Sequence, residues 1–484
     1  MVPPTPPSSP AAPVVARAGT LEYTQGALFG VFAWLLGADL VFTLIDVIEP
    51  RILPVLLKSH GATDTQIGTI LGVFNAVLQL IIMPPLGYRS DRLRTKWGRR
   101  IPILFWVTPF VTLFLALTPF SPEIAAWLAG VPVIKDWLHL LPVAPVILVF
   151  GALVLLYRTV QTATNVCYFG LVRDVVPDSH MGRFLSLFRV FGAAGNAIIL
   201  YWLLGLTETH SKHIFVGIAV LNFVGFMLLC RFVREGQYPP VPPNPAGDGA
   251  GRAARLWGAA TTFVRESYRH PVYLWFYFIR ICLYGVQLGL TTFAVFFPQR
   301  ELGLSLKEIG RISSYPQWVF MVIAFPIGWL VDRRGAIPVL RWGLVAITLG
   351  YLYTFLFTTD RTGFLAGSLV FGVSFWIVMM AQLKLTADVF HPQRYSQLAG
   401  ANTIVQSIAV AAIFSYGVGK LLDALKDWSY TLPVPTVGDV VIGPYRLVYL
   451  MMGLCYLAAL FGLNRVEHHM RQHTGADGKY LAPL

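Results

Sequence analysis

The sequence predicts an all-α polytopic membrane protein in which twelve transmembrane helices form two pseudo-symmetric six-helix bundles. Of its 484 residues, 56% are apolar and only 13% are Asp, Glu, Lys or Arg, about half the charged fraction of a soluble domain. Twelve apolar runs are long enough to cross roughly 30 Å of hydrocarbon, and short motifs recur at matching places in the two halves. These observations exclude a disordered, collagenous or ordinary soluble chain.

Each apolar run has about 20 residues, the length that a membrane-spanning helix requires. We place the spans at residues 27–48, 66–88, 101–119, 143–168, 186–206, 213–232, 273–297, 309–331, 338–358, 363–387, 398–422 and 445–463. An even number of spans puts both termini on one side of the membrane. Lys and Arg are concentrated in alternate loops, most densely at 89–100, and basic loops remain cytoplasmic. We therefore expect both termini in the cytoplasm and the protein in the plasma (inner) membrane.

The spans divide the chain into five regions. We predict a disordered cytoplasmic tail at 1–24, an N-terminal six-helix bundle at 25–232, a cytoplasmic linker at 233–271, a C-terminal six-helix bundle at 272–465 and a cytoplasmic tail at 466–484. The linker begins with a Pro/Gly-rich stretch and continues with arginines among apolar residues. This second pattern is typical of an amphipathic helix on a membrane surface; a solvated linker helix is the alternative.

Two motifs occur at matching positions in the two halves. Asp91 and Arg92 follow the second span, and Asp332 and Arg333 follow the eighth. Similarly, Asp-Val-Val-Pro begins at 174 after the fourth span, and Asp-Val-Phe-His-Pro begins at 388 after the tenth. Internal repeats of this kind are typical of secondary transporters.

The loop between the second and third spans carries a more specific resemblance. Its pattern Gly87-x-x-x-Asp91-Arg92, followed by Gly98-Arg99-Arg100, resembles the signature loop of the major facilitator superfamily, and the resemblance extends over about residues 25 to 465. Five residues separate Arg92 from Gly98. That longer spacing resembles the glycoside–pentoside–hexuronide cation symporters and the related sucrose and maltose transporters.

The resemblance implies the major facilitator fold and a transporter that works by alternating access. We expect it to move a small polar solute, a sugar or glycoside, by symport with H⁺ or Na⁺. Export of amphipathic compounds on the same fold is the alternative. A third possibility is a receptor or assembly factor that transports nothing.

The resemblance also implies a cytoplasmic gate, which in the family stabilises the outward-open state. We assign this role to Asp91 and Arg92, with Gly87 allowing close helix approach and with Asp174 and Arg183 completing a charge network. Fixing the membrane orientation is the alternative role for the basic residues. The predicted gate comprises Gly87, Asp91, Arg92, Gly98, Arg99, Arg100, Asp174, Arg183, Asp332, Arg333 and Asp388.

Ionisable side chains inside predicted spans are costly and mark functional sites by default. Asp39 and Asp46 lie in the first span and Arg158 lies in the fourth. Asp39 and Arg158 are both about 13 residues from the cytoplasmic ends of their spans, hence roughly 20 Å deep, so we expect them to pair. The predicted cation-coupling residues are Asp39, Asp46 and Arg158; an ion pair that only joins two helices is the alternative.

Polar residues recur at helical spacing in several spans, so each set shares one helix face. Spans 1, 4, 7 and 10 line the central cavity in the family, which places many of these faces there. Interhelical hydrogen bonding is the alternative for each. The predicted substrate-binding residues are Asn75, Gln79, Gln161, Asn165, Arg280, Tyr284, Gln287, Gln317, Trp376, Gln382, Asn402 and Gln406.

Other classes of function lack support in the sequence. A phosphate-binding G-x-x-x-x-G-K-[ST] loop and the zinc motif H-E-x-x-H are both absent, so we expect no enzyme, no cofactor and no metal site. The formal net charge of +13 reflects basic loops and not one clustered basic face, so we expect no nucleic-acid partner. The expected partners are a small-molecule solute, a co-transported cation and the lipid bilayer, with the protein as a monomer.

Overall fold

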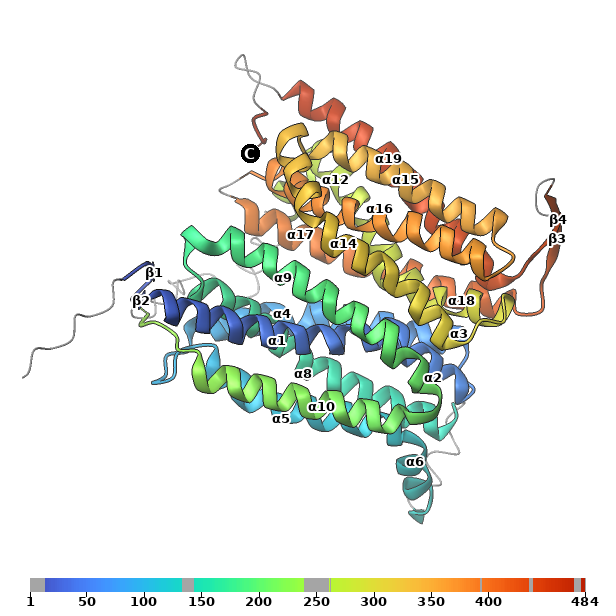
Figure 1. Ribbon diagram of the computed structural model, residues 1–484, viewed down its shortest axis with the longest axis horizontal. Coiled ribbons are helices and arrows are strands. Elements are labelled where there is room, and N and C mark those ends of the chain that lie inside the picture. The colour runs from blue at the N-terminus through green and yellow to red at the C-terminus, as the bar shows by residue number, and fades with distance from the viewer. Residues whose placement is uncertain are drawn as a thin grey trace, which may run out of the picture.

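The computed structural model describes residues 14–132, 143–238, 261, 263–391, 394–434, 438–473 and 480–483. Most of these residues are helical, and the helices form two stacked groups (Figure 1). The first half contains α1 (Gln25–Arg51), α2 (Leu53–Ser59), α3 (Asp64–Gly68), η1 (Thr69–Val73), α4 (Phe74–Arg92), α5 (Ile101–Leu117), η2 (Thr118–Phe120), α6 (Ser121–Ala129), α8 (Pro145–Val175), α9 (Asp178–Ile198), η3 (Ile199–Leu203), η4 (Leu204–Leu206) and α10 (Thr207–Phe232).

The second half repeats this helical organisation. It contains α12 (Pro271–Tyr284), η5 (Gly285–Leu290), α13 (Thr291–Ala294), η6 (Phe297–Glu301), α14 (Leu306–Arg334), α15 (Ala336–Phe357), α16 (Arg361–Val389), α17 (Tyr395–Ala409), η8 (Val410–Gly417), α18 (Val418–Ala424) and α19 (Pro444–Gln472). The segments η1, η3, η5, η6 and η8 are π-helical. Such π-helical turns interrupt α-helices most often at functional positions.

Eleven helical runs in the described ranges are long and apolar enough to cross a membrane. The longest, Asp178–Phe232, comprises α9 and α10, which Figure 1 shows as two neighbouring helices joined at one end. It therefore holds both the fifth and the sixth predicted spans. The prediction of a twelve-helix membrane protein is confirmed.

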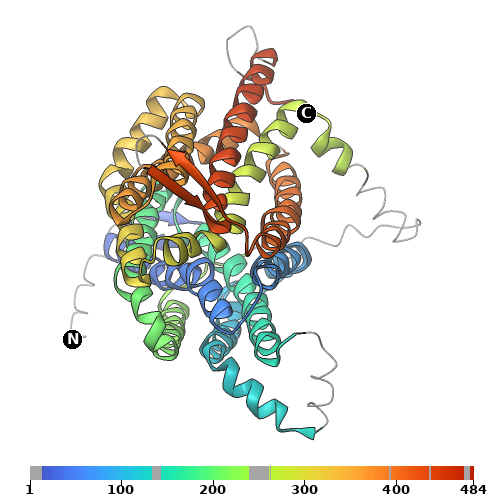
Figure 2. The same ribbon diagram turned by 90° about the vertical axis from the view of Figure 1, so that its right-hand side faces the viewer.

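The helix contacts show the internal symmetry directly. In the first half α5 packs on α8 and α10, and α1 packs on α9 and α10; in the second half α15 packs on α16 and α19, and α12 packs on α17 and α19. These pairs occupy equivalent places in the order of spans. In the end-on view of Figure 2, the helices of the first half, blue to green, lie below most of those of the second, yellow to red.

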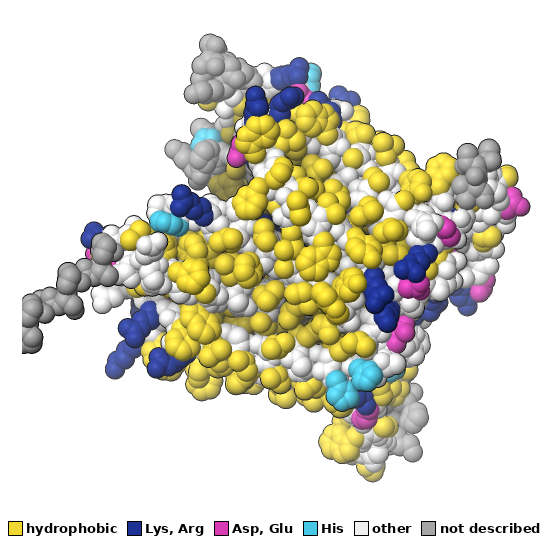
Figure 3. All heavy atoms as spheres, viewed as in Figure 1, with side chains coloured by type: hydrophobic (Ala, Val, Ile, Leu, Met, Phe, Trp, Pro, Cys, Tyr) yellow, Lys and Arg dark blue, Asp and Glu magenta, His cyan; other side chains and the backbone are white. Residues whose placement is uncertain are grey.

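The outer surface of the helices is suited to lipid. On the face in Figure 3, apolar side chains cover the middle, while Lys and Arg gather towards the ends. Large apolar side chains point outward there and elsewhere, including Trp106 at 69% exposed, Val322 at 76% and Phe325 at 63%. A water-soluble monomer rarely exposes so much contiguous apolar surface, so the chain is an integral multi-pass membrane protein.

Part of the tail that we predict to be disordered, at 1–24, is folded instead, while its residues 1–13 lie outside the described residues. Residues 16–23 form a hairpin of β1 (Ala16–Ala18) and β2 (Leu21–Tyr23), and the Tyr23 hydroxyl donates to the Val175 carbonyl at 3.0 Å. Near the other end, Tyr273 donates its hydroxyl hydrogen to the Pro483 carbonyl at 2.6 Å. Figure 1 shows β1, β2 and the C-terminus at the same end of the molecule, as an even number of spans requires.

Parts of the predicted linker, at 239–260 and 262, lie outside the described residues. At the opposite end of the molecule a second hairpin, β3 (Tyr430–Val434) with β4 (Gly438–Ile442), precedes α19. The sequence analysis did not predict it. Arg446, only 3% exposed, anchors it by donating to the Val441 carbonyl at 3.1 Å and the Phe355 carbonyl at 2.7 Å.

The two halves meet tightly at one end of the molecule, the end with the loops that we predict to face outward. Gly419 of α18 lies against the Asp64 backbone, and Gly310 of α14 lies against the Leu200 carbonyl. A Cβ atom at either glycine would overlap these atoms. The π-helices η1 and η8 also contact each other at this end. Small residues therefore let the backbones of the two halves approach closely.

A carboxylate of the second half caps a helix of the first half at this contact. Asp423 of α18 accepts hydrogen bonds from the backbone N–H groups of Asp64 and Thr65, both at 2.8 Å. Asp64 in turn accepts from Lys58 at 2.7 Å and from the Tyr445 hydroxyl at 3.0 Å. The negative charge lies at the N-terminal turn of α3, where backbone N–H groups stabilise it. We call these residues, Lys58, Asp64, Asp423 and Tyr445, the outer lock.

Replacing Asp423 by Ala should open this end more often. Both backbone N–H groups lose a charged acceptor, and hydrogen bonds to charged groups contribute about 1.5–3 kcal/mol, enough for a roughly tenfold shift between conformers. The measurement is maleimide labelling at Ser415→Cys, a position buried at this contact, in a background without the native cysteines. Asp427→Ala is the control, because Asp427 is 88% exposed. Equal labelling in both variants would show that the Asp423 contact does not hold this end closed.

Candidate functional site

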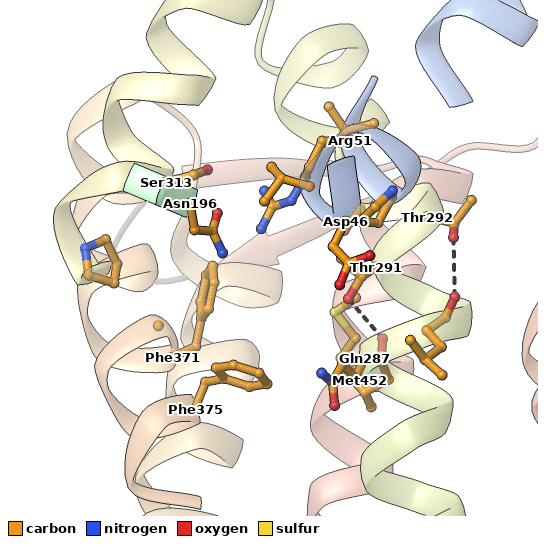
Figure 4. A pocket seen from close by; sticks show the side chains of 18 of the residues that line it. Asp46, Arg51, Asn196, Gln287, Thr291, Thr292, Ser313, Phe371, Phe375 and Met452 are labelled. Atoms are coloured by element: carbon orange, nitrogen blue, oxygen red, sulfur yellow. Dashed lines mark hydrogen bonds between the residues drawn. The ribbon is translucent and has the colours of Figure 1, made fainter. Parts of the chain in front are cut away.

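A cavity of about 480 Å³ lies between the two halves, among the membrane-spanning helices. Asp46 and Arg51 project into it from α1, and Phe371 and Phe375 enter it from α16 (Figure 4). Its remaining walls come from η1, α4, α8, α9, η5, α14, α15 and α19, among others. The polar and aromatic lining residues include Thr43, Asp46, Arg51, Asn75, Gln79, Arg158, Asn165, Arg189, Asn196, Gln287, Thr291, Thr292, Ser313, Gln317, Tyr351, Ser368, Trp376, Tyr449 and Tyr456.

The cavity collects part of the set of predicted site residues. Those that line it are Asp46, Asn75, Gln79, Arg158, Asn165, Gln287, Gln317 and Trp376. Within this set, the Gln79 amide donates to the Asn75 oxygen at 3.2 Å, and the Trp376 ring stacks on Phe320 with centroids 4.0 Å apart. One face of Trp376 is therefore covered by protein and not offered to a solute.

The other predicted site residues lie away from the cavity: Asp39, Gln161, Arg280, Tyr284, Gln382, Asn402 and Gln406. Arg280 donates to the Gln382 oxygen at 2.9 Å and its guanidinium lies 4.4 Å from the Tyr284 ring centroid. Asn402 donates to Gln406 at 3.4 Å along α17. The Arg280–Gln382 bond is the interhelical hydrogen bonding that the sequence analysis gave as the alternative to substrate binding, whereas the Asn402–Gln406 bond lies within one helix.

The pairing of buried charges also differs from the prediction. The sequence pairs Arg158 with Asp39, but in the structure the carboxylate that interacts electrostatically with Arg158 is that of Asp46. Asp39, only 2% exposed, has Arg189 as its basic neighbour. The reason is the length of α8, which continues to Val175, beyond the predicted end at 168. Arg158 therefore lies further from the C-terminal end of its helix than the predicted span implies.

Several cavity residues were not predicted. Arg51 stands at the end of the first span, where a charge usually reaches the membrane surface, so its position inside the cavity could not be read from the sequence. Arg189 and Asn196 were also missed, although they are seven residues apart within the fifth predicted span. That spacing puts both side chains on one helix face, and it is the signal that could have identified them.

The predicted gate loop is held within the first half by ion pairs. Arg99 binds the Asp174 carboxylate through two nitrogens, Nε at 3.0 Å and Nη2 at 2.5 Å. Arg100 contributes a second ion pair to Asp174 at 3.5 Å and hydrogen-bonds Ser90. Bidentate arginine–carboxylate pairs combine charge with fixed geometry. Arg99 and Arg100 therefore do more than set membrane orientation.

The first residues after α10 complete this loop, and the sequence analysis missed them. Glu235 accepts hydrogen bonds from the backbone N–H groups of Arg99 at 2.9 Å, and of Arg100 and Ile101 at 2.7 Å each. It thereby caps the N-terminus of α5, where negative charge is stabilised. Gly98 has φ +108, and a Cβ there would lie 2.5 Å from the Glu235 carboxyl carbon. This glycine is required by both its backbone conformation and its contact.

Tyr238 covers the same network. Its hydroxyl donates to Glu235 at 2.8 Å and to Asp174 at 3.2 Å, and the Arg99 guanidinium lies 4.1 Å from its ring centroid. Burial and the neighbouring Glu235 carboxylate raise the pKa of the Tyr238 hydroxyl. The hydroxyl therefore stays protonated and remains a donor to both carboxylates.

Two expectations about the gate are corrected. Arg183 is exposed on α9 and makes no ion pair with Asp174 or any other described carboxylate. No heavy atom lies within 4 Å of a Cβ built on Gly87, so this glycine does not mediate close helix approach in this conformation, in which the halves meet at the other end. The Asp91 side chain lies outside the described residues, so the role of Asp91 between the two halves stays a prediction.

The second half carries a weaker version of the loop. Asp332 pairs with Lys384 of α16 at 3.3 Å, but its side chain is 83% exposed. Arg333 lies 5.0 Å from the Trp329 ring centroid, and Asp388 is exposed at the end of α16. Arg341 of α15 pairs with Glu467 near the end of α19. Glu467 thus contacts α15, which is the equivalent in the second half of α5, the helix that Glu235 caps.

Two symmetry-related bundles that enclose a polar cavity, closed at one end, define the architecture of a membrane transporter. The sequence profile of the Major Facilitator Superfamily matches residues 27–414, and the chain belongs to this superfamily. It is therefore a transporter of small-molecule solutes and not an enzyme. No curated protein sequence matches the chain.

Solved structures of similar fold are transporters with diverse cargo. A bacterial homologue of the human lysosomal transporter Spinster, in an inward-facing and occupied conformation, is 13% identical, with a TM-score of 0.59 over 94% of this chain and 98% of that one. The nucleoside transporter NupG is 14% identical, with a TM-score of 0.58 over 90% and 99%. A bacterial homologue of the iron transporter ferroportin is 14% identical, with a TM-score of 0.59 over 90% and 98%. At this identity the likeness concerns the fold alone.

Replacing Glu235 by Gln should destabilise the gate loop. The amide keeps its size but loses the charge that accepts three backbone N–H groups, and loss of a helix cap costs about 0.5–2 kcal/mol. The measurement is the apparent Tm of the purified protein in detergent at a fixed heating rate. Glu123→Gln is the control, because the Glu123–Lys212 pair is about half exposed and such pairs contribute little. A Tm loss no larger in E235Q than in E123Q would contradict the capping role.

Proposed function

We propose that this chain is a secondary active transporter that moves a small polar solute, a sugar or glycoside, by symport with H⁺ or Na⁺. The observation that carries this proposal is the Asp46–Arg158 pair on the wall of the central cavity. An ionisable pair inside the membrane is costly to keep and is a functional site by default. The polar amides and hydroxyls around it suit a solute with several hydroxyl groups.

Coupling follows from the charge balance of this pair. A proton or Na⁺ at Asp46 removes the negative charge that Arg158 faces, which leaves the guanidinium available to a solute oxygen. With the cation bound and no solute present, the Arg158 charge has no partner, and moving that charge through the closed state is costly. With no cation bound, Asp46 still occupies the guanidinium, so the solute is not held there. Cation and solute therefore cross together. Asp39 with Arg189 is the second carboxylate–arginine pair that could serve the same purpose.

Alternating access needs a barrier at each end of the cavity. We infer that the outer lock forms the barrier seen here and that the Asp91–Arg100 loop, with Asp174, contributes the opposite one. With both termini cytoplasmic and the protein in the plasma membrane, the structure corresponds to an inward-facing state. The five-residue spacing between Arg92 and Gly98 supports the glycoside–pentoside–hexuronide subtype within the superfamily.

Export of amphipathic compounds is the second candidate, and one feature favours it. An apolar groove of about 470 Å³ lies between the halves, lined by Thr69, Val73, Ala76, Val77, Leu80, Ile408, Ala411, Ala412 and Tyr416. Such a groove would let an amphipathic solute enter from lipid. Ligand-induced thermal shifts with sugars and with lipophilic cations discriminate between the two candidates.

Replacing Asp46 by Asn should abolish uphill accumulation of solute while sparing exchange. The amide matches the carboxylate in shape but has no negative charge for a proton or Na⁺ to neutralise, so the cation gradient no longer drives the solute. The measurement uses proteoliposomes, with accumulation under an imposed H⁺ or Na⁺ gradient and counterflow of a panel of labelled sugars without a gradient.

Asp39→Asn is the matched comparison, because it removes the same charge from the same helix. We expect it to retain accumulation better than D46N. Full accumulation in D46N together with its loss in D39N would move the coupling site to Asp39 and Arg189. Absence of any sugar counterflow in the unmodified protein would reject the sugar proposal itself.

A further inference from the structure

The central cavity contains an arginine that faces no carboxylate among the described residues. Three arginines line the cavity, and two of them, Arg158 and Arg189, face the carboxylates Asp46 and Asp39. The electrostatic neighbours of Arg51 are the uncharged hydroxyls of Tyr351 and Tyr449 instead.

Within the described parts of the chain, Arg51 forms no ion pair or hydrogen bond with another side chain. Arginine stays charged in proteins and is rarely kept without a partner inside a membrane. Since the described residues supply no partner for this charge, a group on a bound solute can supply one.

The surroundings of Arg51 are rich in hydrogen-bond donors. Figure 4 shows Asn196 and Ser313 on one side of the pocket and Arg51 entering from α1. The side chains of Asn196, Ser313 and Tyr351 line the same cavity and make no hydrogen bond to described protein groups. Each can donate to an oxygen of a bound solute, and Asp46 is the only described carboxylate on the cavity wall. A guanidinium flanked by groups that can also donate favours an anionic oxygen group.

We propose that Arg51 binds an acidic group, a carboxylate or phosphate, on the transported solute. The proposal rests on the transport function proposed above and narrows its substrate to an acidic sugar or glycoside. A guanidinium binds such groups through two parallel hydrogen bonds. Arg51 and Asn196 belong to the first half, whereas Ser313 and Tyr351 belong to the second. A bound acid therefore connects the two halves next to the outer lock.

The charge balance of symport supports the same assignment. A solute anion at Arg51 neutralises that guanidinium, and a cation at Asp46 neutralises the carboxylate there. A monoanionic solute and one cation together leave the net charge of the cavity unchanged, so closing the loaded cavity within the membrane buries no additional charge. A neutral sugar would leave the Arg51 charge uncompensated during the same step.

The test compares three probes that share one ring: D-glucose, D-glucuronate and D-glucose 6-phosphate. Binding is measured by tryptophan fluorescence in detergent and transport by counterflow in proteoliposomes. We expect one of the acidic probes to bind at least about tenfold more tightly than glucose, as a charge-assisted contact provides. Arg51→Gln should remove this preference, while Arg51→Lys should retain part of it, because the point charge remains.

Arg361→Gln is the matched control, because Arg361 is 58% exposed in a surface pair with Glu308; it should keep the preference for the acid. Glucose binding and counterflow with no preference for either acid, or a preference unchanged in both R51Q and R51K, would overturn the assignment of Arg51 and leave the transport proposal standing. Failure of all three probes in both assays would reject the sugar proposal and this inference together.

Discussion

The contact between Asp423 and the N-terminal turn of α3 is the interaction on which the observed state depends. It joins a carboxylate of the second half to two backbone N–H groups of the first, at the same end where Gly310 and Gly419 let the backbones touch. Because the two halves are in contact at this end, the space between the bundles forms a cavity that is closed there. Arg51, Tyr351 and Tyr449 then face that cavity, and not the water beyond the lock.

Charges inside the membrane govern the rest of the cavity. Each buried charge must find a partner or leave the hydrocarbon, and the first half meets this requirement, except at Arg51, with carboxylates and arginines that face each other on α1, α8 and α9. The second half contributes amides, hydroxyls and aromatic rings to the wall. The charged residues of the described wall therefore all come from the first half, and a solute that contacts both halves is positioned to bring them together.

The two halves repeat the same helix contacts, but the ion pairs of their two loops differ in burial. In the first half, Glu235 and Tyr238 complete a buried network around Asp174 and Arg99, whereas Asp332 in the second half remains largely exposed. An exposed ion pair contributes little, while a partly buried bidentate pair with a helix cap contributes more. The repeat therefore accounts for the positions of the two loops, whereas local burial determines how strong an ion-pair network each loop forms.

The sequence by itself determined the membrane class, the twelve spans, the repeat and the superfamily, because each follows from local apolar length or from a contiguous motif. It also identified Asp46, Arg158 and several amides of the cavity, since helical spacing puts them on one face. Only the tertiary structure decided that Arg158 faces Asp46 and not Asp39, that Arg280 serves a contact outside the cavity, and that Arg51 points inward. The depth and rotation of each helix depend on packing against its neighbours, and residue counting from span ends cannot supply them.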